Sequence, residues 1–536
     1  MKKTPYILFP AILSLLLFSC KTNEKPEVYT PVNITEESAL LSEIDSIREL
    51  SKTNVIKALW RAKLLQNTLS ENENVLTLYE DCEKLALEEY KNSSGEKKYF
   101  QSLKTVGHEF SKEEMQVLPA SENSFYTTKS SHTSLSELIK GTVTVFVDKG
   151  MKIEHGMGLP DAVLGSGFFI SKEGYIVTNH HVISDLVDPK YEGYSRLYIR
   201  LAEDPDTRIP AKVIGWDSVL DLALLKAEVD APIVFALGSS QDLNVGDRVY
   251  AIGSPLGLDR TLTSGIISAT DRRLFTAGVV FQIDAAVNSG NSGGPLIDEK
   301  GRVQAVVFAG VQNYQGLNFA IPVEYLKNEL EFLYAGGERE HPWIGAYGKT
   351  KREPGSGMKN EGLLVQYVLP GGSANLSGLE KDMTITSLNG AKITSIDDFQ
   401  FYAMQLSSGT IVNVGAVNPL GKESSHLVYL EKRPDNPGYQ VYRHDLIQDA
   451  LVPLVGMRLV PSSTSNRKHY NVVEVLKASA ADEAGFSVND PVDVLAFEVD
   501  DKQTYAQIAL YARKKKNGYL DAPMGLTLPL DSPFYF

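Results

Sequence analysis

The chain has 536 residues, which at roughly 100–200 residues per domain allows about three to five domains. Its composition, 43% hydrophobic and 22% charged, excludes a wholly disordered chain, a collagen-like fibre and a disulfide-rich miniprotein. The formal net charge is −14, with 53 Lys and Arg against 67 Asp and Glu. This acidic balance argues against general nucleic-acid binding, because phosphate binding needs a basic face.

The N-terminus has the pattern of an export signal. Lys2 and Lys3 precede an apolar run, Tyr6 to Phe18, that is too short to cross roughly 30 Å of hydrocarbon but fits a signal peptide. The run ends in Ser19-Cys20, which resembles a bacterial lipobox and implies cleavage before Cys20 and lipidation of its thiol. We therefore expect residues 1–19 to be a lipoprotein signal peptide. The exported chain would be membrane-anchored, on the periplasmic side or at the cell surface. The alternative is an ordinary signal peptide in which the cysteine occurs by chance.

A helical pattern fills much of the next region, residues 20–135. After a polar tether, apolar residues recur at spacings of three and four from Thr35 to about Glu89. A further helix is expected over Lys97–His108, and the Ser/Thr-rich residues 111–135 are typical of a linker. We interpret this region as a spacer or packing segment without chemistry.

From about Gly141 the pattern changes to short β-branched runs separated by Gly and Pro turns. This density of strands predicts an all-β barrel or sandwich over residues 136–335, with Val323–Leu333 as a closing helix. The expected strands are Thr142–Val147, Gly167–Ile170, Tyr175–Thr178, Leu197–Leu201, Arg248–Ile252, Thr263–Ala269, Val279–Ile283, Val303–Phe308 and Leu317–Ile321.

Two later segments resemble each other, which indicates an internal repeat with a period of about 110 residues. Each has an apolar-Gly-apolar turn, then a strand, then a small-residue helix that ends in Gly. The turns are Trp343-Ile344-Gly345-Ala346 and Leu454-Val455-Gly456-Met457. A break at Pro434–Pro437 separates the two units, 340–433 and 438–536.

The most informative stretch is Gly290-Asn291-Ser292-Gly293-Gly294, which places a serine in a tight turn between apolar strands. The glycines permit backbone conformations closed to other residues, and such a turn can direct N–H groups at a developing oxyanion. A serine hydroxyl alone is a weak nucleophile and needs a nearby base that a third group holds. The candidates are His180-His181, at the end of the apolar strand Tyr175–Thr178, and Asp221, at the head of the apolar run Leu222–Leu225.

These residues resemble the trypsin-like serine proteases of the HtrA (Deg) family, whose motifs occur here in the family's order. The matching stretches are Gly165–Phe168, Thr178–Val182, Asp221–Leu224, Ala251–Gly257, Thr263–Ile266, Asp284–Asn288, the serine turn and Asn318–Pro322. The resemblance implies two six-stranded β-barrels with the active site between them, and no metal or other cofactor. The whole chain is then multidomain: a helical segment, a chymotrypsin-like double β-barrel and two α+β domains.

The resemblance also assigns roles to individual residues. His181 directly precedes Val182, as the family's histidine precedes a valine, so it is the expected general base. Asp221 is the expected orienting acid and Ser292 the nucleophile. The oxyanion hole is expected at Gly290, Asn291 and Ser292.

The neighbouring polar residues and the specificity pocket follow from the same comparison. His180 is expected to be structural. Asp217 is a poorer rival to Asp221, because it does not lead directly into the apolar run. In trypsin-like enzymes the residue six before the nucleophile lies at the bottom of the specificity pocket, here Ala286, with Val307 near the opposite wall. Because neither is a carboxylate, we expect small or medium aliphatic side chains before the scissile bond.

The two repeats resemble PDZ domains, which capture a peptide C-terminus by strand addition with backbone N–H groups around its carboxylate. Trp343, Ile344, Gly345 and Ala346 would form the carboxylate loop of the first domain. The second departs further from the pattern, so a docking role stays open for it.

The combined hypothesis is an ATP-independent serine endopeptidase of the cell envelope that cleaves unfolded or damaged proteins, a role that the family resemblance implies. Its expected partners are unfolded substrates, C-terminal peptides, a membrane reached through the lipid, and further copies of the chain in a homotrimer or larger assembly, but no nucleic acid. Two alternatives are a peptide-binding chaperone or scaffold without significant proteolysis, and a surface adhesin.

Overall fold

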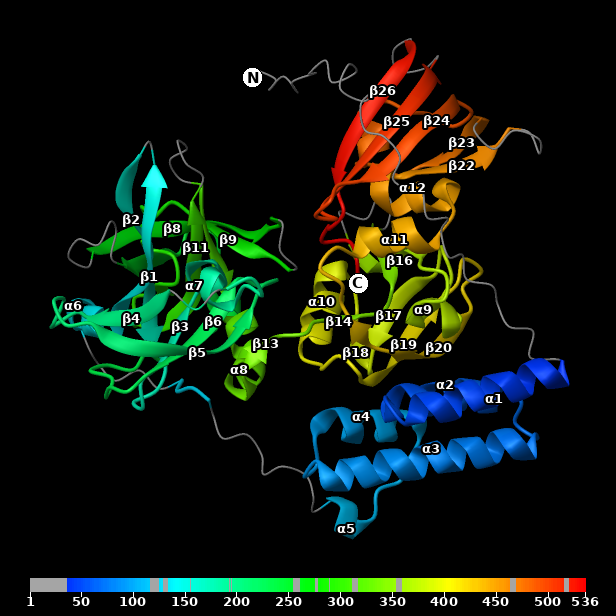
Figure 1. Ribbon diagram of the computed structural model, residues 1–536, viewed down its shortest axis with the longest axis horizontal. Coiled ribbons are helices and arrows are strands. Elements are labelled where there is room, and N and C mark those ends of the chain that lie inside the picture. The colour runs from blue at the N-terminus through cyan, green and yellow to red at the C-terminus, as the bar shows by residue number, and fades with distance from the viewer. Residues whose placement is uncertain are drawn as a thin grey trace.

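Figure 1 shows the computed structural model of the chain, in which a helical unit, a double β-barrel and two smaller sheet domains follow one another. The structure describes residues 36–115, 125–128, 134–154, 156–191, 193, 195–253, 261–274, 278–288, 290–310, 317–352, 359–462, 469–514 and 520–536. The expected signal peptide and Cys20 lie outside these residues. None of the described helices is long and apolar enough to span a bilayer.

The N-terminal unit is helical, as its periodicity predicts. Its helices are α1 (Glu37–Ser51), α2 (Val55–Thr68), α3 (Glu73–Asn92), α4 (Lys97–Val106) and the single turn α5 (Lys112–Met115). The first part of the pattern divides into three helices because Asn54 and Asn72 cap new helix starts. Each of these side chains accepts a hydrogen bond from the backbone of the first turn that follows. Ile44, Trp60 and Tyr90 are buried between the helices.

The first β-barrel has six strands in a closed ring. They are β1 (Thr142–Glu154), β2 (Met157–Phe169), β3 (Tyr175–Thr178), β4 (Arg196–Leu201), β5 (Ile209–Asp217) and β6 (Leu222–Ala227), preceded by the short helix α6 (Leu135–Leu138). Neighbours follow the order β5-β4-β1-β2-β3-β6, and β5 also pairs with β6, which closes the ring. The two-residue strand β13 (Gly337–Glu338) adds to β5 in parallel.

The second barrel is closed as well, in the order β10-β11-β12-β9-β8-β7. Its strands are β7 (Arg248–Gly253), β8 (Thr261–Arg272), β9 (Val280–Ile283), β10 (Pro295–Ile297), β11 (Val303–Gly310) and β12 (Asn318–Pro322), and α8 (Val323–Ala335) follows them. Leu326, Leu330 and Leu333 of α8 are buried in a cluster that also contains residues of both barrels. The expected double barrel is therefore confirmed, and α8 is the expected closing helix.

The first PDZ-like domain is built on an antiparallel sheet of six strands, in which β18 pairs only with β17, and the second on an antiparallel sheet of five strands. The first has β14 (Pro342–Trp343), β15 (Ala346–Arg352), β16 (Asn360–Val368), α9 (Ser373–Leu376), β17 (Thr384–Leu388), β18 (Ala391–Lys392), α10 (Ile396–Met404), β19 (Ile411–Val417), β20 (Glu423–Tyr429) and β21 (Glu431–Lys432). The second has α11 (Pro437–His444), α12 (Ile447–Val455), β22 (Met457–Pro461), β23 (His469–Val475), α13 (Ala480–Glu483), β24 (Pro491–Val499), β25 (Tyr505–Lys514) and β26 (Leu520–Pro529). Residues 500–504, which join β24 to β25, form a turn, so the second domain has no counterpart of α10.

The helical unit packs against one edge of the first PDZ-like sheet (Figure 1). Trp60 Nε1 donates a hydrogen bond to Leu427 O at 2.7 Å, and its ring stacks on Tyr429 with 5.7 Å between centroids. The backbone N–H of Ile411 donates to Ser102 Oγ at 3.0 Å. The expected packing segment thus covers β19 and β20, a contact that the sequence did not locate.

Candidate active site

His181 and Asp221 contact each other at two points. His181 lies in the first turn of α7 (His180–Val187), and Asp221 directly precedes β6. The ring atom Nδ1 of His181 lies 2.7 Å from Asp221 Oδ2, and the backbone N–H of His181 donates to Asp221 Oδ1 at 2.8 Å. The His181 side chain is 46% exposed and that of Asp221 only 15%. The carboxylate therefore orients the ring from the protected side, while a substrate can reach the ring from solvent.

Local pairing places these two residues together. Strand β3 pairs with β6 so that Thr178 lies opposite Ala223, and Asn179 Nδ2 donates to Asp221 O at 2.7 Å. Asp221 has φ of 55°, a left-handed conformation that aspartate tolerates better than most residues do. The sequence predicted the histidine pair at a strand end. In the structure a helix begins there, so the candidate base lies on a helical turn.

Ser292 lies in the turn between β9 and β10, and glycines make this turn possible. Gly290 and Gly293 have φ of 104° and 85°. A Cβ on Gly293 would lie 2.2 Å from Ser166 O and 2.4 Å from Thr178 Oγ1, so a larger residue would force the backbone apart. The turn is bonded to β2, because the backbone N–H of Ser166 donates to Ser292 O at 2.7 Å.

Ser166 also holds the other end of the turn, a role that the sequence did not indicate beyond its place in the Gly165–Phe168 stretch. It is fully buried, and its hydroxyl donates to Gly290 O at 2.5 Å. The peptide groups that flank the expected oxyanion hole are therefore bonded to a single residue. Of the three expected donors, Asn291 has to be removed from the oxyanion hole, because its N–H already donates to Asn288 O at 3.0 Å. Gly290 and Ser292 stay as the candidate donors.

The Ser292 hydroxyl points away from the candidate base. It donates to Phe308 O at 3.2 Å, and no hydrogen bond within the described residues joins it to His181. A change of side-chain rotamer redirects a hydroxyl without moving the backbone. The structure therefore brings His181 and Asp221 into direct contact and places Ser292 with its hydroxyl on a neighbouring carbonyl.

The two expected pocket residues differ in exposure. Ala286 is exposed, and its carbonyl accepts a hydrogen bond from Thr263 Oγ1 at 3.0 Å. Val307, by contrast, is 0% exposed and belongs to the core of the second barrel. The pairing of β11 with β10 and β12 turns the Val307 side chain inward, so the position of Val307 near the pocket wall stays a prediction.

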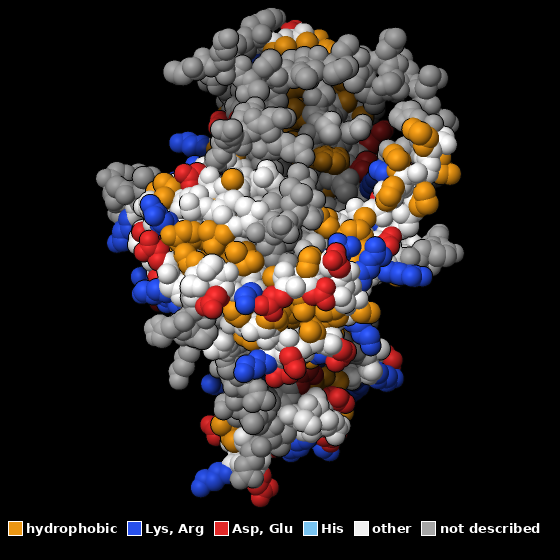
Figure 2. Space-filling model, turned by 90° about the vertical axis from the view of Figure 1, so that its left-hand side faces the viewer, with side chains coloured by type: hydrophobic (Ala, Val, Ile, Leu, Met, Phe, Trp, Pro, Cys, Tyr) orange, Lys and Arg blue, Asp and Glu red, His pale blue; other side chains and the backbone are white. Residues whose placement is uncertain are grey.

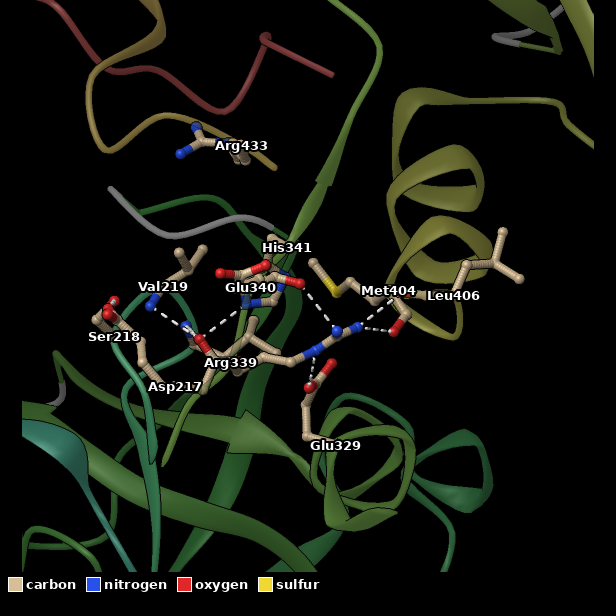
Figure 3. A network of polar contacts seen from close by, with 12 residues as sticks. Asp217, Ser218, Val219, Glu329, Arg339, Glu340, His341, Met404, Leu406 and Arg433 are labelled. Atoms are coloured by element: carbon tan, nitrogen blue, oxygen red, sulfur yellow. Dashed lines mark hydrogen bonds and ion pairs between the residues drawn. The ribbon is translucent and has the colours of Figure 1, made fainter. Parts of the chain in front are cut away.

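Asp217, the rival aspartate, belongs to a buried ion network rather than to the candidate triad (Figure 3). Its Oδ1 accepts hydrogen bonds from the N–H groups of Val219 and Leu220, at 2.9 and 3.0 Å, and lies 2.8 Å from His341 Nε2. Burial acts to raise the pKa of Asp217, but His341 and the two backbone donors lower it overall. Asp217 thus fixes the turn that leads into Asp221.

Glu329 and Arg339 form the second half of this network, with 2.8 Å between Oε2 and Nε. Burial and the charge of Asp217 raise the pKa of Glu329 to about 7, against the lowering effect of Arg339 and His341. Ligand atoms of Asp217, Glu329 and His341 lie within 4.8 Å of one another, a spacing that could suit a metal ion. Because Asp217 already engages His341 Nε2 and Arg339 engages Glu329 Oε2, we assign the cluster as an ion network.

His180, the other member of the histidine pair, is half-buried. Burial lowers its pKa, against the raising effect of Asp221, Asp217 and Glu338. A lowered pKa favours the neutral form of the His180 imidazole, so His180 places no positive charge beside His181. This is compatible with the expected structural role of His180.

The expected carboxylate loop joins β14 to β15 in the first PDZ-like domain. Its carbonyl groups are bonded within the domain, Ile344 O to the N–H of Ala374 at 2.9 Å and Gly345 O to the N–H of Leu369 at 2.8 Å. Gly345 has φ of 83°, which explains why the motif has glycine there. The last member, Ala346, is hydrogen-bonded to another part of the chain, Phe536.

Three family models match parts of the chain. Residues 165–306 match a trypsin-like peptidase domain. Residues 438–530 match the TP0546 family PDZ domain, and residues 38–115 match a domain of unknown function. The first two matches agree with the resemblances derived from the motifs. The third assigns the helical unit to a recognised domain without a role.

Similar proteins carry protease names. A "probable periplasmic serine endoprotease DegP-like" from Marinomonas sp. (strain MWYL1) is 31% identical over 379 residues, 68% of this chain and 76% of that protein. A protein of the same name from Pseudomonas fulva (strain 12-X) is 38% identical over 47% of this chain and 53% of its own length. The chain thus spans about half the length of that second relative.

Solved structures give a weaker likeness. The HtrA-type protease AlgW with decapeptide is 24% identical, covers 56% of this chain and 98% of its own, and superposes with a TM-score of 0.46. The assignment rests instead on the Marinomonas relative, whose alignment spans most of both chains, together with the peptidase match. The chain belongs to the DegP-like (HtrA) family of serine endoproteases.

Proposed function

We propose that the chain is an ATP-independent serine endopeptidase of the cell envelope in which His181, Asp221 and Ser292 form the catalytic triad. The observation that carries this proposal is the two-point contact between Asp221 and His181 beside a glycine-flanked serine turn. Before reaction, the Ser292 hydroxyl turns from Phe308 O towards His181. The N–H groups of Gly290 and Ser292 then receive the oxyanion.

The chemistry follows from these positions. Ser292 Oγ attacks the peptide carbonyl while His181 takes its proton, and Asp221 stabilises the resulting imidazolium. His181 next protonates the leaving amine, and a water molecule activated by the same imidazole hydrolyses the acyl-enzyme. The low exposure of Asp221 supports its role as an acceptor that stays on the ring.

Unfolded or damaged proteins are the proposed substrates. The outer part of the β1–β2 hairpin exposes Met151, Ile153 and Met157 at 71%, 81% and 62%. Figure 2 views the molecule from the barrel side and shows hydrophobic side chains on the surface among charged ones. Apolar surface of this kind suits the apolar segments that an unfolded chain exposes. At Ala286 the lack of a carboxylate supports cleavage after small or medium aliphatic residues.

The proposed location is the bacterial cell envelope, which the periplasmic names of the relatives support. Anchoring through a lipid on Cys20, and assembly into a homotrimer or larger oligomer, are parts of the same proposal. Incorporation of labelled palmitate into the expressed protein, compared with Cys20→Ala, tests the anchor. Equal incorporation into both proteins would rule it out.

Peptide capture is proposed for the first PDZ-like domain through the loop Trp343–Ala346. The loop lies at the start of β15, an edge strand of its sheet, so a peptide can add beside it. In the second domain a turn at residues 500–504 stands where the first domain has α10, which favours a docking role instead.

Labelling with a fluorophosphonate probe tests the proposed triad. We expect the unsubstituted protein to be labelled and to cleave unfolded casein, and Ser292→Ala and His181→Ala to do neither. Labelling of Ser292→Ala would show that a residue other than Ser292 is the nucleophile.

A peptide-binding chaperone without proteolysis is the second candidate, which the Ser292–Phe308 hydrogen bond favours. Under that alternative the unsubstituted protein resists the probe, and Ser292→Ala suppresses aggregation of unfolded casein as well as the unsubstituted protein does.

A further inference from the structure

Residues 534–536 lie along β15 as an added strand. The backbone N–H of Ala346 donates to Phe536 O, and that of Phe536 donates to Ala346 O, each at 3.0 Å. Two residues further along, the N–H of Gly348 donates to Phe534 O at 3.1 Å. Tyr347 and Tyr535 face each other in an antiparallel bridge. This is the pairing by which a sheet edge accepts an extended peptide.

The side chains of this added strand alternate between two cores, as strand geometry requires. Phe536 is 4% exposed and lies in the core of the first PDZ-like domain, where its ring meets Phe399 of α10 with 5.1 Å between centroids. Tyr535 is also 4% exposed but belongs to the core of the second domain, against Tyr347 at 5.2 Å. The segment therefore occupies the space between β15 and α10, where a captured peptide would lie.

Two further contacts hold the segment from its preceding residues. Gln400 Nε2 on α10 donates to Pro533 O at 2.8 Å. Arg433, which is 11% exposed, forms an ion pair with Asp531 at 2.5 Å. Backbone pairing, a buried aromatic ring and an ion pair converge on six residues, 531–536, which we call the docked segment.

We propose that the docked segment occupies the peptide groove of the first PDZ-like domain in cis, and that a captured peptide binds only by displacing it. The inference rests on the proposed peptide capture and names the regulation of that groove. It also defines the kind of peptide that fits: an extended segment with aromatic residues two positions apart, the first beside Gly348 and the second against Phe399. The second domain, in which a turn joins β24 to β25 in place of a helix like α10, thus supplies a ligand to its neighbour.

Displacement is costly because the segment is part of the same chain. A tethered ligand acts at an effective concentration on the order of millimolar, so an external peptide must compete with it. The apparent Kd of the external peptide then rises by the ratio of this concentration to the segment's own Kd. Removal of the segment from the groove should lower the apparent Kd by about tenfold or more.

The test measures the binding of fluorescein-labelled Asp-Ser-Pro-Phe-Tyr-Phe to the full chain by fluorescence anisotropy, in a Ser292→Ala background that prevents digestion of the probe. We expect the additional substitution Phe536→Asp to tighten binding about tenfold or more, because a carboxylate cannot enter the core around Phe399. The control is Tyr505→Asp, on an aromatic side chain of the same domain that is 50% exposed and outside the docked segment. Equal affinity in all three proteins overturns the proposal.

A second variant and a second measurement guard against misfolding. Asp531→Asn removes only the ion pair with Arg433 and should tighten binding by a smaller factor. Hydrogen exchange at the N–H groups of Ala346 and Gly348 reports occupancy directly. We expect protection in the parent protein, fast exchange in Phe536→Asp, and restored protection when the peptide is added.

The two proposals fail in different ways. In one outcome, the N–H groups of Ala346 and Gly348 are protected in the parent protein but not in Phe536→Asp, and the peptide binds none of the proteins. The groove is then occupied in cis but captures nothing, which refutes peptide capture alone. Fast exchange at Ala346 and Gly348 in the parent protein refutes occupancy by the docked segment.

Discussion

Asp217 and Asp221 are four residues apart, and their surroundings give them different roles. Asp221 reaches the ring and the backbone of His181, next to solvent. Asp217 is completely buried, and its partners are two backbone donors and His341. The position at the head of an apolar run correctly favoured Asp221 as the partner of the histidine. The partner of Asp217 could not be predicted, because His341 lies more than a hundred residues away and only the folded chain brings it near.

Substituting these two residues separately should separate catalysis from stability. Asp221→Asn should lower kcat by about ten-thousandfold with little change in Tm, because the imidazole loses the acceptor that fixes its tautomer. Asp217→Asn should lower the free energy of unfolding by about 1–3 kcal/mol, because it removes the buried carboxylate that His341 and two backbone N–H groups contact. Casein cleavage and thermal unfolding measure the two effects. A large loss of Tm in Asp221→Asn with normal kcat would reverse the assignment.

Glu329 should make stability depend on pH. Its pKa is raised to about 7 in the folded chain, so between pH 5 and 7 the folded state holds a proton that the unfolded state has released. The free energy of unfolding of the unsubstituted protein should therefore fall with rising pH, relative to Glu329→Gln, by about 2 kcal/mol across this window. Denaturant titrations of both proteins at pH 5, 6 and 7 measure the difference. A constant difference would show that the carboxyl titrates normally.

Among the strands of the two barrels, β5 and β10 are two that the sequence did not predict, and their local patterns are irregular or short. Strand β5 carries Pro210 and Gly215, which argue against a strand on local grounds, and the three residues of β10 are too few to show a period. Gly215 is required because a Cβ there would lie 2.4 Å from Leu333 O of α8. Tertiary contact with a distant helix therefore decides this position, whereas the alternating and apolar runs of β3 and β7 were read correctly from their local sequence.

The contact between α2 and β20 should be essential for docking the helical unit. Trp60→Ala should cost about 3–5 kcal/mol of docking and folding free energy, because it empties a fully buried site. Trp60→Phe should cost about 1 kcal/mol, mainly for the lost hydrogen bond to Leu427 O. Limited proteolysis should release residues 36–115 from Trp60→Ala only. Leu41→Ala, at a side chain 49% exposed on α1, is the control that should behave like the parent protein.

At the scale of the whole molecule, the first PDZ-like domain contacts the helical unit, the second barrel and the second PDZ-like domain. Its sheet has the helical unit on β20 at one edge and the docked segment on β15 at the other. Helix α10 also faces the second barrel: the N–H of Gly278 donates to Gln400 Oε1 at 3.1 Å, on the side chain whose Nε2 bonds Pro533 O. One glutamine thus contacts both the protease barrel and the docked segment. The order of domains was predictable from the motifs, but this packing depends on side chains from four separate regions.

Arg339 connects the barrels to α10, and its removal should loosen that connection. It is bonded to Glu329 of α8, and its Nη2 donates to Met404 O and Leu406 O, each at 2.9 Å. Arg339→Leu should lower the free energy of unfolding by about 1–3 kcal/mol, because the buried Glu329 carboxyl and two carbonyl groups lose their hydrogen-bond donor. Small-angle scattering should show a larger radius of gyration, because the two carbonyl contacts to the PDZ-like domain are lost as well.

The double substitution Glu329→Leu/Arg339→Leu separates these two consequences. Two apolar side chains in place of a buried ion pair are often tolerated, so stability should recover towards that of the parent protein. The radius of gyration should stay enlarged, because no leucine can donate to Met404 O and Leu406 O. Lys432→Gln is the matched control, since it breaks the exposed Lys432–Glu340 pair at the same junction and should change neither quantity. A compact double variant would show that apolar packing, rather than Arg339, holds the PDZ-like domain against the barrels.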